Sequence, residues 1–408
     1  MKNSVDVIFF VEHKDRELES ISAIANLLKD KGISSLILST YFHTHYALVY
    51  SAKMYIFPYM LNRSDWPVCL IADMYEDTVL YMNMNWEQLL SSVNLSYKKP
   101  QDGFVKKQVK HLVWNDPFKD YLEKSGVDRK NIAVLGNPAN DILYGLLDRY
   151  HEWRDLLSKE FSIDQSKKWL FLPMNYAWAF SSNKMIEGKI QKGYPADTAW
   201  EHREYAYKCL VEFIYFVDAL SEMKEYEIII RPHPSISEKD YMNVFMRELG
   251  YLPEGVLLNK AHSIREWIIA SDIVGSSWST SVWDAYNIGK EVFLFTPYER
   301  PQWLDVWWNS QIANIQNIDN WKTSKKYIAD PQRNNSIENV TSYIVSCIEH
   351  RGRQERKSYR PLVGHWKQIL KTLLLHYGIV KRDAYEYDRF DPILIDVDSD
   401  KDRMSKKT

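Results

Sequence analysis

Hydrophobic and polar positions near the start of the chain follow the pattern of a strand, a helix and a second strand. Residues 5–11 form an almost continuous apolar run, residues 18–28 carry apolar side chains at helical spacing, and residues 34–39 form another apolar run. Gly32 ends the predicted helix. This order predicts a βαβ unit, and strands without polar alternation indicate a parallel sheet that is covered on both faces.

The same alternation continues to about residue 150. Four further apolar runs predict short strands, at residues 54–57, 68–72, 111–114 and 132–135. Helical spacing predicts helices at residues 86–93 and 117–124. The first part of the chain is therefore predicted to be a doubly wound α/β domain.

The pattern restarts after a charged helical stretch, which predicts a domain boundary near residue 160. Strands are expected in the second half at residues 169–172, 226–230, 255–258, 272–275 and 291–295. Helices are expected at residues 150–160, 200–223, 263–270 and 281–288. Two Rossmann-like domains that face a common cleft are the architecture this implies.

These boundaries divide the chain into four predicted parts. The N-terminal domain is predicted to span residues 1–160 and the second domain residues 161–350. Residues 351–390 form a C-terminal segment with an amphipathic helix at about 362–377. Residues 391–408 are predicted to be a disordered tail, because the chain from residue 396 onward is charged and nearly devoid of apolar groups.

Composition limits the functional classes. The chain has 408 residues, with 52 basic and 54 acidic residues and a formal net charge of −2. No broad basic surface is expected to attract nucleic acid, so any anion site must be local. The three cysteines lie far apart without a CxxC pair, which favours reduced thiols in a cytoplasmic protein. No apolar run reaches the ~18 residues of a membrane span, and charged residues follow the first apolar run too closely for a signal peptide.

Ligands of open α/β sheets bind beyond the carboxyl ends of the strands, so the residues that follow each predicted strand are site candidates. Arg231-Pro232-His233-Pro234 follows the strand at residues 226–230. The prolines stiffen the turn, Arg231 can form a bidentate contact with phosphate, and His233 can donate a hydrogen bond or a proton near neutral pH. A rigid turn without a ligand, in which Arg231 only braces the chain, is the structural alternative.

A second candidate is the sequence Gly-Ser-Ser-Trp-Ser-Thr-Ser at residues 275–281. Hydroxyls and unpaired N–H groups at a helix start favour an anion. N-capping by Ser279 or Thr280 needs no ligand, but five hydroxyl residues where one cap suffices favour phosphate binding. The candidate ligands are Ser276, Ser277, Ser279 and Thr280.

The first domain offers candidates in the same positions. Asn137 lies in a tight turn after a predicted strand and is a further donor-side candidate, while Asp141 in that turn either faces the cleft or begins a helix. An acceptor hydroxyl needs a general base, and Glu12 and Asp15 follow the first predicted strand. The other acceptor-side candidates are Arg16, Glu17, His43 and His45. Solvated charges at a helix start are the alternative interpretation of each.

Metal and nucleophilic chemistry are not expected. The sequence contains no HExxH motif and no DxD motif between apolar strands. It also lacks the GxSxG nucleophile elbow. The predicted site is therefore free of metal and needs no cofactor.

In their order along the chain, these motifs resemble a bacterial family of surface carbohydrate biosynthesis proteins with the GT-B glycosyltransferase fold. The matching pieces within about residues 5–300 are Glu12 to Leu18, Val113-Trp114, Gly136-Asn137-Pro138 with Asp141, residues 231–234, and Ser271-Asp272 leading to residues 276–280. The second-half pattern is similar to CDP-glycerol glycerophosphotransferases and to transferases that use CMP-Kdo or CMP-sialic acid. Ala139 and Asn140 stand where the related families have Arg, so no role of that Arg is carried over.

The resemblance implies a donor activated by a cytidine nucleotide, with His233 near its phosphate and the hydroxyls of Ser277, Ser279 and Thr280 around it. We therefore expect a metal-independent GT-B glycosyltransferase that moves a Kdo- or sialic-acid-like sugar to a glycan or lipid-linked glycan acceptor in capsule or lipopolysaccharide O-antigen assembly. Transfer of a polyol phosphate from CDP-glycerol or CDP-ribitol is the alternative reaction. A non-catalytic glycan-binding partner of an assembly complex is the alternative from another class. Association with such a complex or with the inner face of the plasma membrane is left open.

Overall fold

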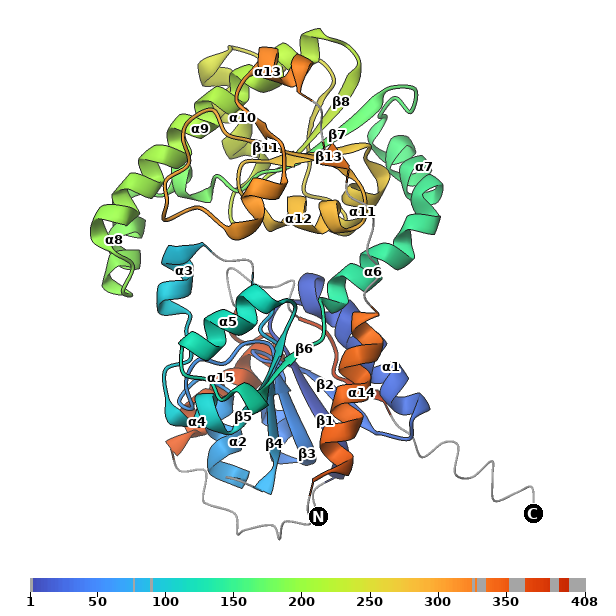
Figure 1. The fold of residues 1–408 in the computed structure, drawn as a ribbon, viewed down its shortest axis with the longest axis vertical. Helices are drawn as coiled ribbons and strands as arrows, with labels where there is room; N and C mark the ends of the chain where they lie inside the picture. Colours follow the sequence, from blue (N-terminus) through green and yellow to red (C-terminus); the bar gives the residue numbers. More distant parts are fainter. Residues whose placement is uncertain are drawn as a thin grey trace, which may run out of the picture. The chain divides into compact units, whose positions relative to one another are not determined.

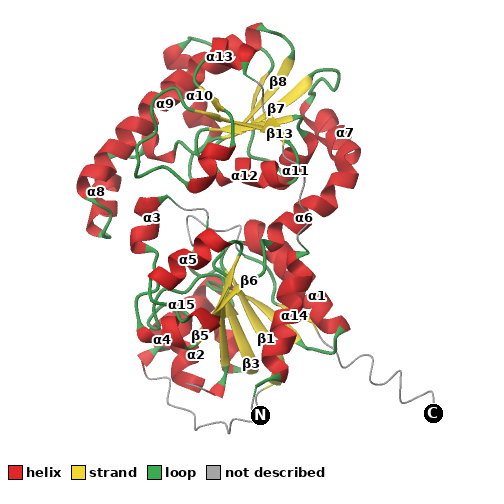
Figure 2. Ribbon diagram, viewed as in Figure 1, coloured by secondary structure: helices red, strands yellow, loops and turns green. Residues whose placement is uncertain are grey.

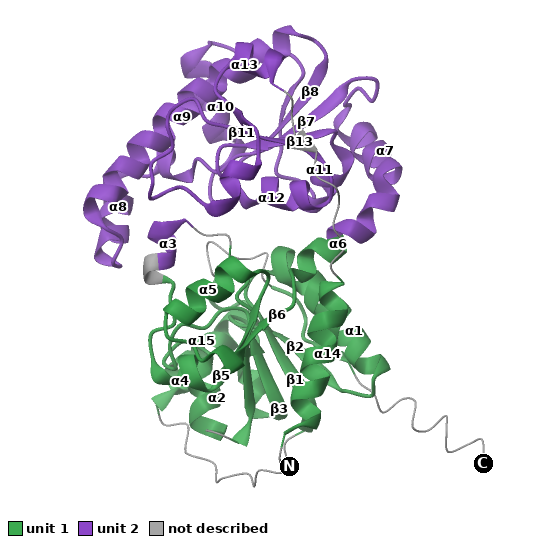
Figure 3. Cartoon of the chain, in the orientation of Figure 1, with its two compact units in different colours: residues 1–88, 98–142, 334–408 green, residues 89–97, 143–333 purple. Residues whose placement is uncertain are grey.

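The computed structural model describes residues 3–75, 78–88, 91–324, 327–328, 335–351, 364–381 and 389–395. The chain forms two compact α/β units (Figures 1 and 3). Unit 1 comprises residues 1–88, 98–142 and 334–408, and unit 2 comprises residues 89–97 and 143–333. Each unit has its own sheet, with helices on both faces (Figure 2).

The sheet of unit 1 has the strand order β14-β2-β1-β3-β4-β5-β6, and all neighbouring strands are parallel except β14 and β2. Its strands are β1 (Asn3–Val11), β2 (Ser35–Ser39), β3 (Tyr50–Phe57), β4 (Leu80–Asn83), β5 (Val109–Val113), β6 (Ile132–Val134) and β14 (Ile393–Ile395). Its helices are α1 (Glu19–Asp30), α2 (Val68–Tyr75), α4 (Gly103–Lys107), α5 (Asp116–Lys124), α14 (Ser336–Glu349) and α15 (Trp366–His376), with the shorter turns η1 (Lys14–Leu18), η2 (Thr44–Leu48) and η4 (Arg129–Asn131). Helix α6 (Pro138–Leu146) continues from unit 1 into unit 2.

Alternate residues of the central strand β1 supply the two cores of unit 1, as the two-residue period of a strand requires. Phe9 belongs to the core that includes residues of α1 and α14. Phe10 belongs to the core on the other face, which includes residues of α2 and Ile369 of α15. The continuous apolar run in the sequence is therefore the signature of a strand buried on both faces.

The sheet of unit 2 has the parallel order β12-β11-β10-β7-β8-β9, and β13 pairs with β11 in antiparallel fashion. Its strands are β7 (Lys168–Pro173), β8 (Tyr226–Arg231), β9 (Val256–Leu258), β10 (Ile273–Ser276), β11 (Glu291–Phe295), β12 (Asn314–Ile315) and β13 (Tyr327–Ile328). Its helices are α3 (Ser92–Tyr97), α7 (Tyr150–Phe161), α8 (Asn183–Gln191), α9 (Ala196–Glu222), α10 (Glu238–Glu248), α11 (Ile264–Ala270), α12 (Thr280–Asn287) and α13 (Ile318–Thr323), with the turns η5 (Leu147–Arg149), η6 (Ala177–Phe180) and η7 (Trp307–Gln311). With these strands and helices, the predicted α/β fold of two Rossmann-like domains is confirmed.

Close packing between β10 and β11 requires a glycine. Gly275 pairs with Phe293 in the register of these strands. A Cβ atom at residue 275 would lie 2.0 Å from the Phe293 ring. This contact explains why a glycine interrupts an otherwise apolar strand.

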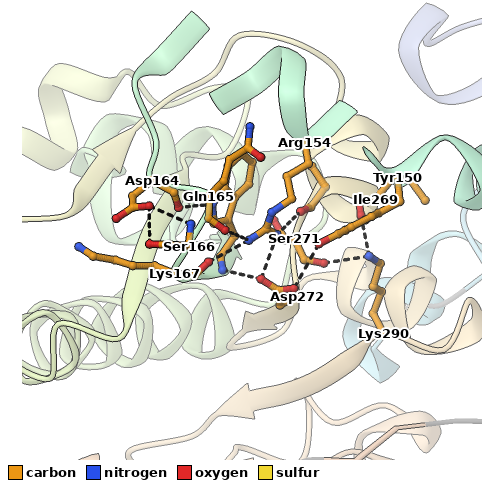
Figure 4. Close-up of polar contacts among 12 residues, drawn as sticks. Tyr150, Arg154, Asp164, Gln165, Ser166, Lys167, Ile269, Ser271, Asp272 and Lys290 are labelled. Carbon is orange, nitrogen blue, oxygen red and sulfur yellow. Dashed lines mark hydrogen bonds and ion pairs between the residues drawn. The ribbon is translucent and has the colours of Figure 1, made fainter. Parts of the chain in front are cut away.

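The boundary between the units differs from the predicted one at residue 160, because α7 is bonded to unit 2. Arg154 of α7 donates to Asp272 Oδ2 at 3.0 Å and to the carbonyl oxygens of Ala270 and Lys167, as Figure 4 shows in part. Its guanidinium also lies 4.5 Å from the centre of the Trp169 ring. A nearly buried guanidinium with these partners holds the helix against the amino end of the sheet of unit 2.

The predicted second domain at residues 161–350 is not continuous either. Helix α14 packs on α1 of unit 1. Asp141 helps to receive it, because its Oδ2 accepts the backbone N–H of Ile337 at 2.8 Å. Strand β14 lies within the predicted disordered tail at 391–408 and pairs with β2, whereas residues 396–408 lie outside the described residues.

Two predicted elements of the first half are wrong. Residues 68–72 were expected as a strand and form part of α2, because a short, fully buried apolar run suits either element. Residues 86–88 precede α3 without helical structure, since the Gln88 side chain bonds Leu112 O and Trp114 N–H at the end of β5. Strand β4, which carries no strong pattern, was missed.

Candidate functional site

The loops after β7, β8 and β10 lie together at the carboxyl edge of the sheet of unit 2. Ser276 Oγ donates to Pro173 O at 2.7 Å, which joins the ends of β10 and β7. The hydroxyls of Tyr176 and Ser277 are 2.5 Å apart, which joins the loops that follow these two strands. The strand order β10-β7-β8 then places the His233 loop on the other side of β7.

His233 is partly buried and uncharged at neutral pH. Its Nδ1 accepts the backbone N–H of Ser235 at 3.2 Å and lies 2.8 Å from Ser235 Oγ. Because a backbone N–H can only donate, the imidazole proton resides on Nε2. Burial, with the charges of Lys260 and Lys189, lowers the pKa of His233 to about 4. The side chain thus offers a neutral Nε2–H donor.

Arg231 and Lys260 hold the loops on either side of His233. Arg231 Nη1 and Nη2 donate to the carbonyl oxygens of Ala261 and His262, each at 2.9 Å. Lys260 Nζ donates to the carbonyl oxygens of Pro234 and Ile236 at 2.8 and 2.9 Å. These contacts agree with the interpretation that Arg231 braces the loop, and Lys260 also places positive charge near the imidazole.

The four hydroxyl candidates have different surroundings. Ser276 is fully buried and its hydroxyl is committed to Pro173, so it supports the loop and does not face a ligand. Ser277 is buried against Tyr176. Ser279 is the N-cap of α12 and accepts the N–H of Ser281 at 3.3 Å. Thr280, the first residue of α12, is exposed.

Sequence reasoning missed two cations near these loops. Arg300 follows β11, and its Nη2 donates to Ser277 O at 3.4 Å while its side chain is nearly buried. Lys189 of α8 lies 3.6 Å from the centre of the Trp178 ring. Arg300 could have been selected by its position after a strand, as His233 was. Lys189 lies inside a helix and carries no comparable signal in the sequence.

Aromatic side chains gather around the same loops. Trp178, after β7, stacks on His202 with ring centres 4.3 Å apart. His202 also approaches Trp303 at 4.8 Å, and Trp278 approaches Tyr176 at 5.2 Å. Burial lowers the pKa of His202 to about 3, so this imidazole is neutral. The edge combines flat apolar rings, hydroxyls and cations, a set that suits a nucleotide.

In unit 1, Glu12 follows β1 and lies at the carboxyl edge of the sheet. It is partly buried, and its Oε1 accepts the Tyr41 hydroxyl at 2.7 Å. Tyr41 follows the neighbouring strand β2. Asp15, the other candidate base, is exposed on the turn η1. Of these two candidate bases, Glu12 is therefore the one whose carboxylate is held by a hydrogen bond from another side chain, that of Tyr41.

Arg16 and Glu17 form a charge network with Glu87, which follows β4, and Lys98, which follows α3. Glu17 is fully buried, and burial raises its pKa although Arg16 opposes this shift. Arg16 Nη2 lies 2.6 Å from Glu17 Oε1, and its Nη1 lies 3.0 Å from Glu87 Oε1. Lys98 Nζ contacts the other oxygen of Glu87. Glu17 is occupied by this network, and its buried carboxylate is not placed to meet an acceptor.

The two histidine candidates after β2 are packing residues. His43 is buried, and its Nδ1 accepts the N–H of Ser39 at 3.1 Å. Burial lowers its pKa to about 3, and burial with the neighbouring His376 lowers the pKa of His45 to about 4. Both rings contact the ring of His376 on α15. They pack against a helix that covers the sheet, and their contact with an acceptor stays a prediction.

Asn137 belongs to unit 1, whereas the other donor-side candidates belong to unit 2. Its Oδ1 accepts the N–H of Ala139 at 3.1 Å, and its Nδ2 lies 3.4 Å from Asn140 Oδ1. The nearly buried side chain closes its own turn. Its contribution to a donor site stays a prediction.

Over the described residues, no group of three or more His, Cys, Asp or Glu side chains is arranged to hold a metal ion. No described helix is long and apolar enough to cross a membrane. The three cysteines are free thiols. Independence from metal stays a prediction about the reaction.

No protein-family model matches the chain, and no curated protein matches its sequence. Solved structures do match its fold. A point variant of the wall teichoic acid polymerase TagF has a TM-score of 0.53 at 11% identity, over 85% of this chain and 89% of that chain. The UDP-GlcNAc 2-epimerase of Methanocaldococcus jannaschii, in complex with UDP-GlcNAc and UDP, has a TM-score of 0.53 at 13% identity, over 85% of this chain and 100% of that chain.

A third match is a putative UDP-N-acetylglucosamine 2-epimerase from Listeria monocytogenes, with a TM-score of 0.51 at 12% identity, over 88% of this chain and 100% of that chain. Identities this low establish the fold alone. The chain has the GT-B-like arrangement of two parallel-sheet α/β domains that these enzymes share. The expected fold class is thus confirmed by the neighbours as well as by the strand order.

Proposed function

We propose that the chain is a cytoplasmic transferase of surface glycan synthesis that takes a group from a cytidine-nucleotide-activated donor. The favoured reaction transfers a Kdo- or sialic-acid-like sugar from its CMP-linked donor to a capsule or O-antigen acceptor. The observation that carries the proposal is the carboxyl edge of unit 2, where the neutral donor His233 lies near Lys189 and Lys260, and where the loop of Ser277 follows β10 on the other side of β7.

On the donor side, His233 Nε2–H donates to a phosphate oxygen and stabilises the charge that develops as CMP leaves. Ser279 and Thr280 add a hydroxyl and the N-terminus of α12, where unpaired N–H groups favour an anion. Arg231 acts as a positioning residue through the loop carbonyls it holds. Because its pKa is about 4, His233 acts as a hydrogen-bond donor at neutral pH and not as an imidazolium acid.

On the acceptor side, Glu12 takes the proton of the acceptor hydroxyl, and Tyr41 orients the carboxylate. The acceptor oxygen forms a bond with the anomeric carbon while the bond from that carbon to the phosphate oxygen of CMP breaks. The electron pair leaves with CMP, so atoms and charge balance without metal or cofactor. Asp15 is the competing candidate for the base.

The second candidate reaction is transfer of a polyol phosphate from CDP-glycerol or CDP-ribitol. The fold likeness to the wall teichoic acid polymerase TagF favours it. Here the acceptor oxygen attacks phosphorus and the bond between the two phosphates breaks, which again releases CMP. The same anion site serves both reactions, so the structure of unit 2 supports either donor.

A donor screen tests the proposal. The purified chain is titrated with CMP by calorimetry and then incubated separately with CMP-Kdo, CMP-sialic acid, CDP-glycerol and CDP-ribitol, together with glycan from the source cells. CMP release and the product mass are measured. Release from one CMP-sugar with a matching mass increase of the glycan is the expected result.

The variant His233→Ala and the control His151→Ala, an exposed histidine of α7, complete this experiment. Release that depends on His233 but not on His151 supports the proposed site. Turnover with CDP-glycerol or CDP-ribitol alone selects the second reaction. Glycan binding without CMP binding or turnover would identify a non-catalytic partner and overturn both reactions.

A further inference from the structure

The described part of the C-terminal segment, residues 364–381, exposes an unusual number of large apolar side chains. Helix α15 packs on unit 1 through Ile369 and Leu375, which are buried. Trp366 is 56% exposed, and Tyr377, just beyond the helix, is 71% exposed. The other exposed apolar residues of the segment are Leu370, Ile379 and Val380. An exposed apolar patch of this kind marks an interaction site.

Three of these side chains form one stripe along the helix. At about 100° per residue, Trp366, Leu370 and Tyr377 fall within a sector of roughly 40° when the helical spacing is extended by one residue. Lys367 and Lys371 lie along the adjacent edge of the stripe by the same spacing. Lys367 Nζ is 5.6 Å from the centre of the Trp366 ring. Apolar and cationic groups therefore share one exposed face of the helix.

The charge of this segment contrasts with that of the whole chain. Residues 364–381 contain the lysines 367, 371 and 381 and neither Asp nor Glu, although the chain has a net charge of −2. In the adjoining sequence, residues 351–360 contain five basic residues and one acidic residue, and residues 383–388 contain three acidic residues. The exposed stripe itself is thus matched to a negatively charged partner.

Unit 1 holds both ends of α15. His365 Nε2 lies 2.8 Å from Asp73 Oδ2 of α2 at the start of the helix. At its end, the ring of His376 lies 5.4 Å from His43 and 5.0 Å from His45. The stripe is therefore presented by an ordered helix and not by a loose tail.

We propose that this stripe, Trp366, Leu370 and Tyr377 with Lys367 and Lys371, binds the surface of an anionic lipid bilayer together with the exposed Ile379, Val380 and Lys381 just beyond the helix. Trp and Tyr side chains settle at the level of the lipid headgroups. The apolar side chains enter the boundary of the acyl region while the lysines contact anionic headgroups. Residues 364–381 contain no acidic residue, so a symmetric dimer formed through this stripe would bring the lysines of the two copies together. An anionic lipid surface is therefore favoured over a second copy of the chain.

Vesicle co-sedimentation of the full chain tests this proposal without any measurement of turnover, so it is separable from the transferase hypothesis. The chain is mixed with vesicles of phosphatidylcholine alone or with about a third phosphatidylglycerol. Binding to the anionic vesicles is expected, and it falls steeply with salt because exposed charges are screened. The double variant Lys367→Gln with Lys371→Gln is expected to weaken this binding about tenfold.

A triple variant, Trp366→Ser with Leu370→Ser and Tyr377→Ser, is expected to lose binding. The matched control is Met246→Ser with Tyr251→Ser, which removes apolar side chains of similar exposure from unit 2 and should bind like the parent chain. No binding of the parent chain to anionic vesicles overturns the proposal, as does equal binding of the triple variant. Self-association that the triple variant abolishes, without vesicle binding, would assign the stripe to a second copy and also overturn it.

Discussion

The two sheets end in loops of similar position but different chemistry. In unit 2, the carboxyl edge carries a neutral imidazole at His233, with Lys189 and Lys260 close enough to lower its pKa. In unit 1, the charged residues at the carboxyl edge are paired with each other, as Arg16 is with Glu17 and Glu87. Both edges follow parallel strands, but the described charges of unit 1 are paired with each other, whereas in unit 2 the proposed function assigns the Nε2–H of His233 to an anion.

This difference shows that a position after a strand places a residue at the edge but does not determine its state. Ser276 and Ser277 are neighbours in sequence, yet one hydroxyl joins two strand ends and the other meets Tyr176. Glu12 and Glu17 flank one turn, yet one is held by a tyrosine hydroxyl and the other is buried against Arg16. The role of a polar side chain at such an edge therefore depends on the hydrogen-bond or ion-pair partner that a neighbouring loop supplies.

The largest expected effect comes from Glu12→Gln in unit 1. If Glu12 is the base, kcat falls by about 10²–10⁴. The fold is expected to persist because the amide oxygen still accepts the Tyr41 hydroxyl. Donor binding, measured by calorimetry with CMP, should stay within about twofold since the residues of unit 2 are unchanged. Asp15→Asn is the matched control, and a loss of kcat there with normal activity of Glu12→Gln would reverse the assignment.

His233→Ala tests the edge of unit 2. Removal of its Nε2–H should lower kcat by about 10²–10³, the usual cost of one donor to developing charge. Because the pKa of His233 is about 4, its ionisation should not appear in the rate profile of the parent chain between pH 5.5 and 8. If His233 instead acted as an imidazolium acid, kcat would fall as the pH rises through about 6.5. Such a fall would contradict the role of a neutral donor.

Arg154→Ala tests whether α7 belongs to unit 2. The substitution removes the nearly buried guanidinium from three backbone carbonyls and takes the ion-pair partner from Asp272, which keeps the Trp169 N–H, so the free energy of unfolding should fall by about 2–3 kcal/mol. Arg149→Ala removes an exposed pair with Glu152 and should change it by less than about 0.5 kcal/mol. Urea unfolding followed by tryptophan fluorescence measures both. Equal effects of the two variants would refute the role given to Arg154.

The smallest effect concerns the histidines of unit 1. Burial lowers the pKa of His43 to about 3 from about 6.5, so the unfolded chain binds the proton first as pH falls. Its contribution to stability is present above pH 6.5 and is lost between about pH 6.5 and 3, with about 2 kcal/mol lost between pH 7 and 5. Urea titrations at the two pH values should show this loss, reduced in His43→Gln and unchanged in His151→Gln. An equal pH dependence in both variants would show that His43 titrates normally.

Much of the fold followed from the sequence. Continuous apolar runs predicted β1, β2, β8 and β11 because strands buried on both faces cannot tolerate polar alternation. The strand predicted at residues 68–72 was wrong for the same reason, since a short helix buried on all sides also gives a continuous apolar run. The domain boundary predicted at residue 160 was wrong because α7 is held to unit 2 by Arg154, and the sequence around Arg154 does not show which residues it will contact.

The site was predicted in outline. Position after a strand selected His233, Ser277, Ser279 and Glu12, and it would also have selected Arg300. It could not select Lys189, whose relation to His233 arises only when α8 packs near the loop. It also could not separate His43 from His233, because burial by α15 depends on a helix more than 300 residues away.

By itself, the sequence determined the alternation of strands and helices, the two sheets and the edge at which polar residues gather, because hydrophobic period and turn chemistry are local properties. The tertiary structure decided the division into units, the proton on His233 Nε2 and the pairing of Arg16 with Glu87. Each of these depends on groups distant in the chain that meet only when the strands are ordered. Desolvation and hydrogen bonding act on that assembled neighbourhood, so no local pattern encodes them.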